Sequence, residues 1–533
     1  MINFSSLKNT KMLFFVLSMC IWNAEAQEVN IIPYPNQVEM QNGVFNLSAS
    51  TRIYYDKEFK NEAVFLQQLL LNEHQLKLAV SEQSSDFIRG NIYLKLSDAE
   101  PANPEGYTLK VDENNILATS GFPTGVFYAI QSLRQIIKNQ GKNKVTVQCL
   151  TINDTPRLAW RAFMLDEARY FKGAKVVKNL LDEMALLKMN TFHWHLTDDP
   201  GWRIEIKKYP LLTQVGGTRK ESEIGTWLSN KFDGKVHSGF YTQEQIKDII
   251  KYAADRHITI IPEIEMPGHA SAAMAAYPWL GTENKKITVP TVFRIQLNVF
   301  NVTSDRVNKF LRDVLDEVME LFPSKIVHIG GDEVKYDQWK NSPEVNEYMK
   351  KNNISSYADL QISFTNAISN YLEQKQHRMM GWNEIISGQH ENNDSTDAMT
   401  QKLSSNVIVH FWTGSPKIIN QAAEKGYDLV NSYSEYTYLD YDYKTTSLQK
   451  AYSFNPVPDS IPEHLRDKIL GLGCQMWGEW IPTVAKMNYQ IFPRIAAHAE
   501  TGWTQTARKD FARFTGALSY LKNHWSRKGY YTN

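Results

Sequence analysis

Two patterns of hydrophobic and polar residues follow one another along the chain, and the change falls near Thr155-Pro156. In the first part, short segments alternate apolar with polar positions, which is typical of half-buried strands. These segments span residues 44–47, 52–55, 91–96, 107–111 and 115–119. Residues 127–138 then show the apolar spacing of a helix. We therefore expect residues 27–156 to form a small α+β domain with an antiparallel sheet.

In the second part, apolar runs that predict strands alternate with longer segments of helical spacing. The eight runs span residues 161–166, 191–196, 259–264, 325–329, 378–381, 406–411, 427–430 and 469–475. The helical segments between them include residues 174–188, 243–256, 304–321, 357–375 and 417–425. This alternation predicts an α/β fold, a parallel (β/α)8 TIM barrel, over residues 157–510. Residues 511–533 are predicted to form a final helix that packs on the barrel.

The first 26 residues have the features of a secretory signal peptide. Lys8 and Lys11 precede an apolar run at residues 12–22, and Ala24-Glu25-Ala26 offers the small-residue pattern of a cleavage site. The run is too short to cross a bilayer, and no later segment is long enough. Cys20 suggests a lipid anchor, but the apolar run continues past it. We expect an exported protein without a membrane span, cleaved near Ala26.

Composition narrows the class of partner and the compartment. Lys plus Arg and Asp plus Glu both total 58, and this balance suggests neither a nucleic acid nor a membrane surface as partner. Cys149 and Cys474 are the cysteines left after cleavage, so a disulfide framework is not expected. An exported chain of this kind resembles a bacterial periplasmic or cell-surface enzyme. The 13 tryptophans suit the faces of sugar rings.

Candidate chemistry gathers at the C-terminal ends of the predicted barrel strands, where such barrels carry their active sites. The strand at residues 325–329 leads into Gly330-Gly331, which lets the backbone turn sharply and approach a ligand. Asp332 and Glu333 follow, and repulsion between adjacent carboxylates favours a raised pKa in one of them. Acidic, histidine or tryptophan residues also end most other strands: Asp198-Asp199, Glu265, His269, Trp382, Glu384, Trp412, Trp477 and Glu479.

Two carboxylates in a tryptophan-lined cleft suggest glycoside hydrolysis. Retaining enzymes usually place an acid and a nucleophile on different elements flanking the scissile bond, which the adjacent Asp332 and Glu333 fit poorly. A better assignment has Glu333 protonate the leaving oxygen while Asp332 contacts another part of the substrate. If the sugar carries a 2-acetamido group, its carbonyl oxygen can attack the anomeric carbon. Asp332 would then orient the amide nitrogen and stabilise its charge.

The segment His328-Ile329-Gly330-Gly331-Asp332-Glu333 resembles the catalytic signature of the β-N-acetylhexosaminidases, family 20 of the glycoside hydrolases. The resemblance extends to residues 161–171, 193–203 and 262–269 in the barrel. Residues 32–35, 106–107 and 125–128 are similar to the small domain that precedes the barrel in this family. The resemblance implies an exo-acting enzyme that releases terminal N-acetylhexosamine from glycans and retains the β configuration through an oxazoline intermediate.

The resemblance also implies a role for each matching residue. Glu333 would act as general acid and then as base, while Asp332 and Tyr438 would hold the acetamido N–H and oxygen. His269, paired with Asp198, would stand behind Glu333 and tune its pKa. Further substrate contacts would come from Arg161, Trp382, Trp412, Asp440, Trp477 and Glu479. No cofactor and no metal are expected.

Two other classes remain as alternatives. His193-Trp194-His195 gives an H-x-H pattern found in metal-dependent barrel hydrolases, although the further ligands of such a site are not evident. A non-catalytic carbohydrate-binding protein would use the tryptophans but would not need both Asp332 and Glu333. Glu265 departs from the family, which usually has aspartate there, and Ala162 stands where glycine is usual.

The sequence leaves the choice of substrate open in several respects. It does not decide between GlcNAc and GalNAc, and it does not identify the aglycone as chitin oligomer, N-glycan, mucin glycan or peptidoglycan fragment. The aglycone is expected to depend on the loops at residues 216–239 and 282–294. The oligomeric state is open as well.

Overall fold

The computed structural model describes residues 29–82, 87–97, 103–141, 144–386 and 402–531. The predicted signal peptide and Cys20 lie outside the described residues. Within the part of the chain that is described, every helix is too short or too polar to cross a bilayer.

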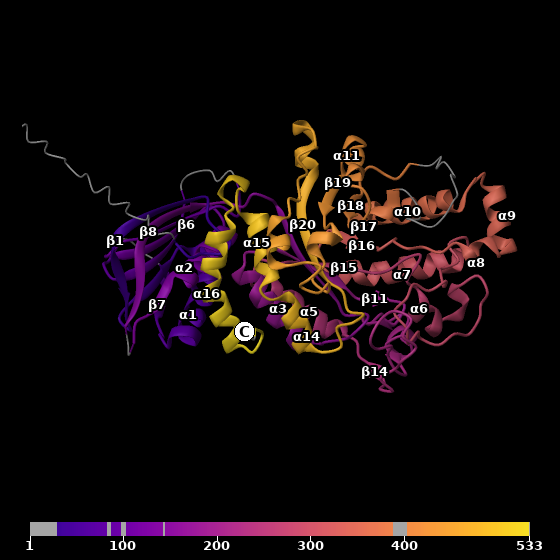
Figure 1. Ribbon diagram of the computed structural model, residues 1–533, viewed down its shortest axis with the longest axis horizontal. Coiled ribbons are helices and arrows are strands. Elements are labelled where there is room, and N and C mark those ends of the chain that lie inside the picture. Colours follow the sequence, from indigo (N-terminus) through magenta and orange to yellow (C-terminus); the bar gives the residue numbers. More distant parts are fainter. Residues whose placement is uncertain (1–28, 83–86, 98–102, 142–143, 387–401, 532–533) are drawn as a thin grey trace, which may run out of the picture.

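The N-terminal domain is one sheet covered by two helices, drawn from indigo to purple in Figure 1. Its strands run in the order β1-β8-β5-β6-β4-β2-β3, and β7 pairs with β8. The strands are β1 Gln37–Leu47, β2 Arg52–Tyr55, β3 Ala79–Glu82, β4 Asn91–Leu96, β5 Tyr107–Val111, β6 Asn115–Ser120, β7 Ile137–Asn139 and β8 Val145–Asp154. Helices α1 (Lys60–His74) and α2 (Pro123–Ile136) pack against the sheet and each other.

The sheet is mixed, so the prediction of an antiparallel sheet is wrong for part of it. β1 with β8, β5 with β6 and β5 with β8 are antiparallel. β2 pairs in parallel with both β3 and β4, and β4 pairs in parallel with β6. The reason is α1, which forms a crossover between β2 and β3, because parallel neighbours cannot be joined by a tight turn.

The second part is a closed parallel barrel, which confirms the predicted fold. Its strands follow the order β10-β15-β16-β17-β18-β19-β20-β9. They are β9 Trp160–Asp166, β10 Thr191–His195, β15 Thr259–Glu263, β16 Ile326–His328, β17 Arg378–Trp382, β18 Ile408–Phe411, β19 Asp428–Asn431 and β20 Ile469–Met476. Each overlaps one predicted run, because apolar residues facing both the barrel interior and the outer helices make near-continuous apolar segments.

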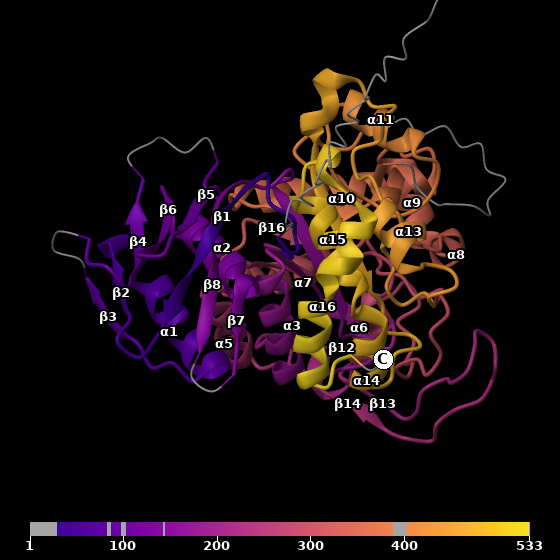
Figure 2. The same cartoon turned by 60° about the vertical axis from the view of Figure 1, so that its left-hand side comes forward.

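Helices and short hairpins surround this barrel (Figures 1 and 2). The helices are α3 Ala174–Leu186, α4 Leu211–Gln214, α5 Gln243–Ala254, α6 Ser271–Ala276, α7 Asp305–Leu321, α8 Asp337–Lys340, α9 Pro343–Lys351, α10 Tyr357–Gln374, α11 Lys417–Glu424, α12 Ser434–Thr437, α13 Leu448–Ser453, α14 Val484–Ile491 and α15 Arg494–Trp503. The hairpin strands are β11 Thr197–Asp198 with β12 Gly201–Trp202, and β13 Thr218–Arg219 with β14 His237–Ser238.

The last helix, α16 (Phe511–Arg527), lies where the two parts of the molecule meet (Figure 2). It packs on barrel helix α3 through Glu183, whose carboxylate accepts hydrogen bonds from Trp525 Nε1 at 2.8 Å and Lys528 Nζ at 2.8 Å. At its other end, Arg513 donates to the backbone oxygen of Ile31 at 3.2 Å. The final helix therefore ties the N-terminal domain to the barrel.

Candidate active site

A hollow of 530 Å³ opens at the C-terminal end of the barrel. This volume suits a small ligand. Nine of the eleven predicted site residues line it: His269, Asp332, Glu333, Trp382, Trp412, Tyr438, Asp440, Trp477 and Glu479. Asp198 lies behind this wall, in contact with His269. Arg161 lies near the N-terminal end of β9 and does not line this hollow.

The turn after β16 presents the two adjacent carboxylates. Gly330 and Gly331 have φ angles of 65° and 89°, in the left-handed region that favours glycine. A Cβ on Gly330 would overlap the Glu265 carboxylate, so glycine is also required by space. Glu333 itself has a φ of 51°, which is unusual for a side chain of its size and typical of functional sites. The turn leaves Asp332 nearly buried and the Glu333 side chain 31% exposed.

His269 connects these carboxylates to a second acidic pair. Its Nε2 lies 3.6 Å from both Asp332 Oδ2 and Glu333 Oε2. Its Nδ1 lies 3.3 Å from Asp198 Oδ1 and 3.2 Å from Asp199 Oδ2. The predicted pairing with Asp198 is thus present in the structure, and it is shared with Asp199. The imidazole therefore lies between two pairs of carboxyl groups, Asp332 with Glu333 on one side and Asp198 with Asp199 on the other.

The surrounding charges favour the protonated form of His269. Burial by itself would lower its pKa, but Asp198, Asp199 and Asp332 outweigh burial and raise the pKa well above its usual value. For Asp198, burial raises the pKa while Arg169 and His269 lower it, and the net result is a strongly lowered value. For Asp332, burial is the largest influence, and its pKa is raised despite the contact with His269. The site thus combines an imidazolium with closely spaced carboxyl groups.

Arg169 lines the hollow and was not among the predicted site residues. Its Nη1 lies 2.7 Å from Asp198 Oδ2, and its Nη2 lies 3.7 Å from Glu479 Oε1. Its guanidinium carbon lies 5.1 Å from the centre of the Trp477 ring. The signal was available in the sequence, because Arg169 follows the C-terminal end of the first barrel strand, the end at which barrels place their sites.

Arg161 was expected to contact the substrate, and the structure corrects this expectation. It lies at the N-terminal end of β9, fully buried. Its guanidinium donates to both oxygens of Glu105, at 2.6 and 3.0 Å, and to the backbone oxygens of Leu158 and Lys188 at 2.7 and 2.9 Å. These bonds fasten the barrel to the N-terminal domain. The guanidinium is therefore remote from the hollow and committed to protein acceptors.

Three tryptophans and a tyrosine form the apolar walls. Trp382 Nε1 donates to Glu263 Oε1 at 2.9 Å, which holds the ring from inside the barrel. Trp412 stacks on Tyr438, with ring centres 6.0 Å apart and an interplanar angle of 9°. Tyr438 in turn lies 6.0 Å from Trp477, and Trp477 lies 5.7 Å from Trp382. The rings therefore form a connected enclosure suited to a small apolar group and a sugar face.

Glu384 is a further residue that the predictions left without a role. Its Oε2 accepts a hydrogen bond from Trp412 Nε1 at 2.9 Å. Burial, followed by the nearby Asp332 carboxylate, raises the pKa of Glu384 to about 8. The residue thus holds a wall tryptophan in place and is neutral at pH 7. Its position directly after β17 was the signal in the sequence.

Two more carboxyl groups lie on the far side of the hollow. Burial raises the pKa of Asp440 to about 8, with a smaller contribution from Glu479. Burial also raises the pKa of Glu479, to about 6, although Arg169 opposes this change. Asp440 is therefore mainly neutral at pH 7, and Glu479 is held beside a guanidinium. Both line the hollow, as the sequence predicted.

The two histidines of the H-x-H pattern, His193 and His195, lie in a buried cluster around Glu263 inside the barrel. Glu263 lies 2.8 Å from His193 Nε2, 2.5 Å from His195 Nδ1 and 2.9 Å from His328 Nδ1. His193, Glu263 and His328 carry the side-chain types of a metal site, and their ligand atoms lie close together. Among the described residues, Glu263 forms a hydrogen bond with His195, whereas His193 Nε2 has no hydrogen-bond partner and His328 Nδ1 accepts from the Gly330 N–H. Glu263 also accepts from Trp382 Nε1, so its observed role is to support this wall tryptophan.

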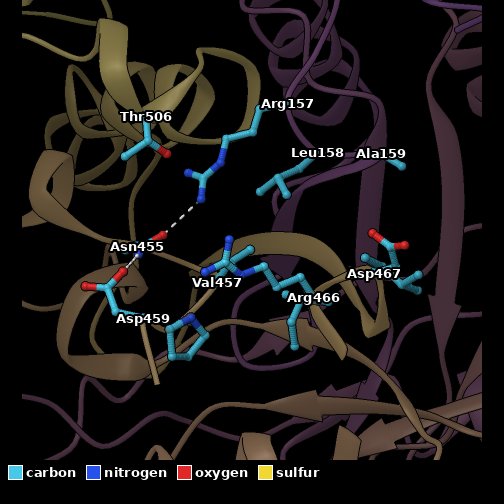
Figure 3. A pocket seen from close by; sticks show the side chains of 12 residues that line it. Arg157, Leu158, Ala159, Asn455, Val457, Asp459, Arg466, Asp467 and Thr506 are labelled. Atoms are coloured by element: carbon cyan, nitrogen blue, oxygen red, sulfur yellow. Dashed lines mark hydrogen bonds between the residues drawn. The ribbon is translucent and has the colours of Figure 1, made fainter. Parts of the chain in front are cut away.

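A second hollow of 530 Å³ lies near the N-terminal ends of β9 and β20 (Figure 3). Arg157 donates to Asn455 Oδ1 at 3.0 Å, and Asn455 donates to Asp459 Oδ1 at 3.1 Å. Arg466 and Asp467 also line it, so opposite charges share its wall. It is at the wrong end of the barrel for catalysis and lacks the aromatic enclosure described above.

The barrel, the paired carboxylates and the aromatic enclosure together define a glycoside hydrolase. Residues 158–506 match the model of glycosyl hydrolase family 20, catalytic domain, and residues 28–155 match domain 2 of the same family. The chain therefore belongs to glycosyl hydrolase family 20, as its sequence motifs indicated. The two matched ranges meet at the observed boundary between β8 and β9.

Relatives and solved structures agree with this membership. A β-hexosaminidase of Porphyromonas gingivalis is 36% identical over 512 residues, covering 92% of this chain and 62% of the relative. A β-hexosaminidase of Vibrio furnissii is 35% identical, covering 90% of this chain and 77% of the relative. The structure of an exo β-N-acetylglucosaminidase of Vibrio harveyi, in complex with N-acetylglucosamine, has a TM-score of 0.81 at 32% identity and covers 95% and 78% of the two chains.

Proposed function

We propose that the protein is an exo-acting, retaining β-N-acetylhexosaminidase that uses the substrate's acetamido group as nucleophile. The hexosaminidase activity is supported by family membership and by the names of the relatives. The mechanism is supported by one feature of the site. Among the described carboxyl groups that line the hollow, Asp332 and Glu333 share one turn. Of the other two described groups, Asp440 is mainly protonated and Glu479 is paired with Arg169, so neither is a free carboxylate nucleophile for the anomeric carbon.

The reaction follows from these positions. Glu333 protonates the glycosidic oxygen while the acetamido carbonyl oxygen attacks the anomeric carbon, which releases the leaving group and forms an oxazoline. The Asp332 carboxylate accepts the amide N–H and stabilises the positive charge that develops there. The Tyr438 hydroxyl donates to the acetamido oxygen, and Trp382, Trp412 and Trp477 enclose its methyl group. Glu333 then removes a proton from water, which attacks the anomeric carbon and restores the β configuration.

His269 has a supporting part in this scheme. Its imidazolium lies 3.6 Å from the carboxyl groups of Asp332 and Glu333, and it opposes the rise that burial causes in the pKa of Asp332. Asp198 and Asp199 hold the ring from the other side. Arg169, Asp440 and Glu479 bind hydroxyl groups of the sugar at the closed end of the hollow. This arrangement accounts for exo-action, because a terminal sugar fills the enclosure and the rest of the glycan leaves through the mouth.

The test compares an aryl 2-acetamido-β-glucopyranoside with the corresponding aryl β-glucopyranoside. We expect turnover of the acetamido sugar only, and a loss of about 10²- to 10⁴-fold in Glu333→Gln and in Asp332→Asn. NMR of the first-formed product should show the β anomer. Comparable turnover of the plain glucoside, or an α product, would rule out substrate assistance. Activity should also survive exhaustive dialysis against a chelator, and loss that added metal restores would favour the metal-dependent alternative.

We also propose that the protein is exported, to the periplasm or the cell surface, with the first 26 residues removed. This rests on the charged residues, apolar run and small-residue pattern at the start of the sequence. N-terminal sequencing of the protein from fractionated cells should give Gln27 as the first residue. Uncleaved protein in the cytosol would contradict the proposal.

A further inference from the structure

The mouth of the hollow is walled by aromatic residues from three separate loops. Trp227 comes from the segment between β13 and β14, Phe293 from the segment before α7, and Trp480 from the segment after β20. All three line the same hollow as Glu333, together with Arg294. Since the enclosure holds the terminal sugar, this outer wall lies where the leaving group must pass.

We propose that this wall is a binding position for the leaving sugar, whose ring packs against Trp227 and Trp480. The inference rests on the proposed hexosaminidase function and specifies its substrates. It predicts that the preferred aglycone is a pyranose ring rather than a small alcohol. Pyranose rings carry an axial C–H face, which packs favourably on indole rings, and Arg294 offers several N–H donors for hydroxyl or carbonyl oxygens at the ring's edge.

The wall is fixed in place without a ligand. Trp227 and Phe293 both pack edge-on against Trp480, with ring centres 5.2 and 5.6 Å away and interplanar angles of 89° and 86°. Phe293 is 5% exposed, and the guanidinium of Arg219 lies 5.4 Å from its ring centre. The surface therefore needs little ordering when a sugar binds, which lowers the entropic cost of binding.

The backbone of these loops is also tied together. Glu223 N–H donates to the backbone oxygen of Thr291 at 2.7 Å, which joins the loop of Trp227 to the loop of Phe293. Glu223 also forms a bridge with Phe232, which closes the segment that carries Trp227. Trp227 nevertheless remains 51% exposed. A large ring held in water beside the catalytic acid is a favourable surface to cover with substrate.

Neighbouring apolar residues allow a different explanation to be tested. Leu228 is 62% exposed and Val236 is 70% exposed on the same loop, and an apolar surface of this kind can serve as a protein contact. Neither residue lines the hollow, whereas Trp227 does. If the wall binds the leaving sugar, replacing Trp227 should lower kcat/KM and replacing Val236 should not. If the patch is a subunit contact, replacing either residue should have an effect. Val236→Ala is therefore the matched control.

The experiment measures kcat/KM for Trp227→Ala and Val236→Ala on two substrates. One is methyl 2-acetamido-β-glucopyranoside, whose leaving group has no ring, and the other is the β-1,4-linked disaccharide of N-acetylglucosamine. We expect Trp227→Ala to lose about tenfold on the disaccharide. It should stay within about twofold of the native enzyme on the methyl glycoside, and Val236→Ala should stay within about twofold on both.

The other outcomes separate the possible failures. Equal losses of Trp227→Ala on both substrates, or no loss on the disaccharide, would overturn the sugar position. Equal effects of both variants, with a change of mass in sedimentation, would assign the patch to a subunit contact and overturn it as well. If the native enzyme turned over neither substrate, the proposed function itself would fail. Because Trp227 is half exposed, its replacement leaves the buried core untouched.

Discussion

The two ends of the first barrel strand each carry an arginine, and their surroundings differ. Arg161, at the N-terminal end, donates to Glu105 and to two backbone oxygens at distances between 2.6 and 3.0 Å. Arg169, beyond the C-terminal end, has one short contact, with Asp198 at 2.7 Å. Its other carboxylate contacts are longer, at 3.4 Å to Asp166 and 3.7 Å to Glu479.

The difference shows how buried charge serves stability at one end and chemistry at the other. At the catalytic end, buried polar atoms without a hydrogen-bond partner accumulate: Arg169 Nε, Glu265 Oε1 and Oε2, Asp332 Oδ1 and Asp440 Oδ1. Such atoms cost stability unless a partner arrives, and a sugar supplies many hydroxyl and amide groups. Arg169, Asp332 and Asp440 line the hollow, so their unmet hydrogen bonds lie at the proposed substrate site. At the N-terminal end, by contrast, the guanidinium of Arg161 is satisfied by acceptors of the protein itself.

Arg169→Met should give the largest effect that this comparison predicts. Removing the guanidinium leaves Glu479 without its cation and Asp198 with the histidines alone, which costs about 2–5 kcal/mol in transition-state binding. We expect kcat/KM to fall by about 100-fold or more on an aryl acetamido glycoside. Arg169→Lys should recover only part of this, because lysine lacks the planar fork of donors. Retention of more than about a third of the activity in Arg169→Met would show that the guanidinium is structural.

Arg161→Met should have the opposite profile. It leaves Glu105 uncompensated at the domain junction, so the free energy of unfolding in urea should fall by about 3 kcal/mol. The kcat/KM of the folded fraction should stay within about twofold of the native value, because the side chain is far from the hollow. Adding Glu105→Gln to this variant should restore part of the lost stability. A specific loss of activity with native stability would return Arg161 to the substrate site.

The sequence predicted the barrel strands well because their signal is local. A strand buried on both faces is an apolar run, and each of the eight runs became a barrel strand. The direction of the strands in the N-terminal sheet cannot be read from any short segment, because it depends on how α1 connects β2 to β3. Position along the strand was also decisive: Asp332, Trp382 and Trp477 lie at or after the C-terminal ends of their strands and line the hollow, whereas Arg161 lies at the N-terminal start of β9.

Other parts of the site depend on contacts that no short segment carries. Glu263 on β15 holds Trp382 on β17 across the intervening strand β16, and three histidines lie close to its carboxylate inside the barrel. Trp227 lies in a loop more than 100 residues before Glu333, and only the closed barrel brings both to one hollow. For Glu265 the sequence was partly informative. It showed glutamate where the family usually has aspartate, but it did not show which groups surround the side chain.

Glu265 gives the smallest expected effect in the comparison between buried charges near the hollow and buried charges that are paired within the fold. Burial, followed by the charges of Asp332 and Glu263, raises its pKa well above 4.5, although His269 opposes this change. The unfolded chain therefore releases this proton at lower pH than the folded protein does, so raising the pH above about 4.5 favours unfolding. In Glu265→Gln the group cannot ionise, and the native protein should lose stability relative to this variant between about pH 5 and pH 8.

Glu183, which fastens α16 to α3, gives the control of opposite sign. Burial would raise its pKa, but the contacts with His524 and Lys528 outweigh burial and lower the pKa to about 2. Its ionised form therefore stabilises the fold fully above about pH 4.5, and this contribution is lost as the pH falls toward about 2. Urea unfolding at pH 8 should find Glu265→Gln more stable and Glu183→Gln less stable than the native protein, each by on the order of 1 kcal/mol or more, and only the Glu265 difference should shrink at pH 5. If both differences had the same sign, Glu265 would be ionised and paired in the fold, and the contrast between charges held for chemistry and charges held for stability would not extend to it.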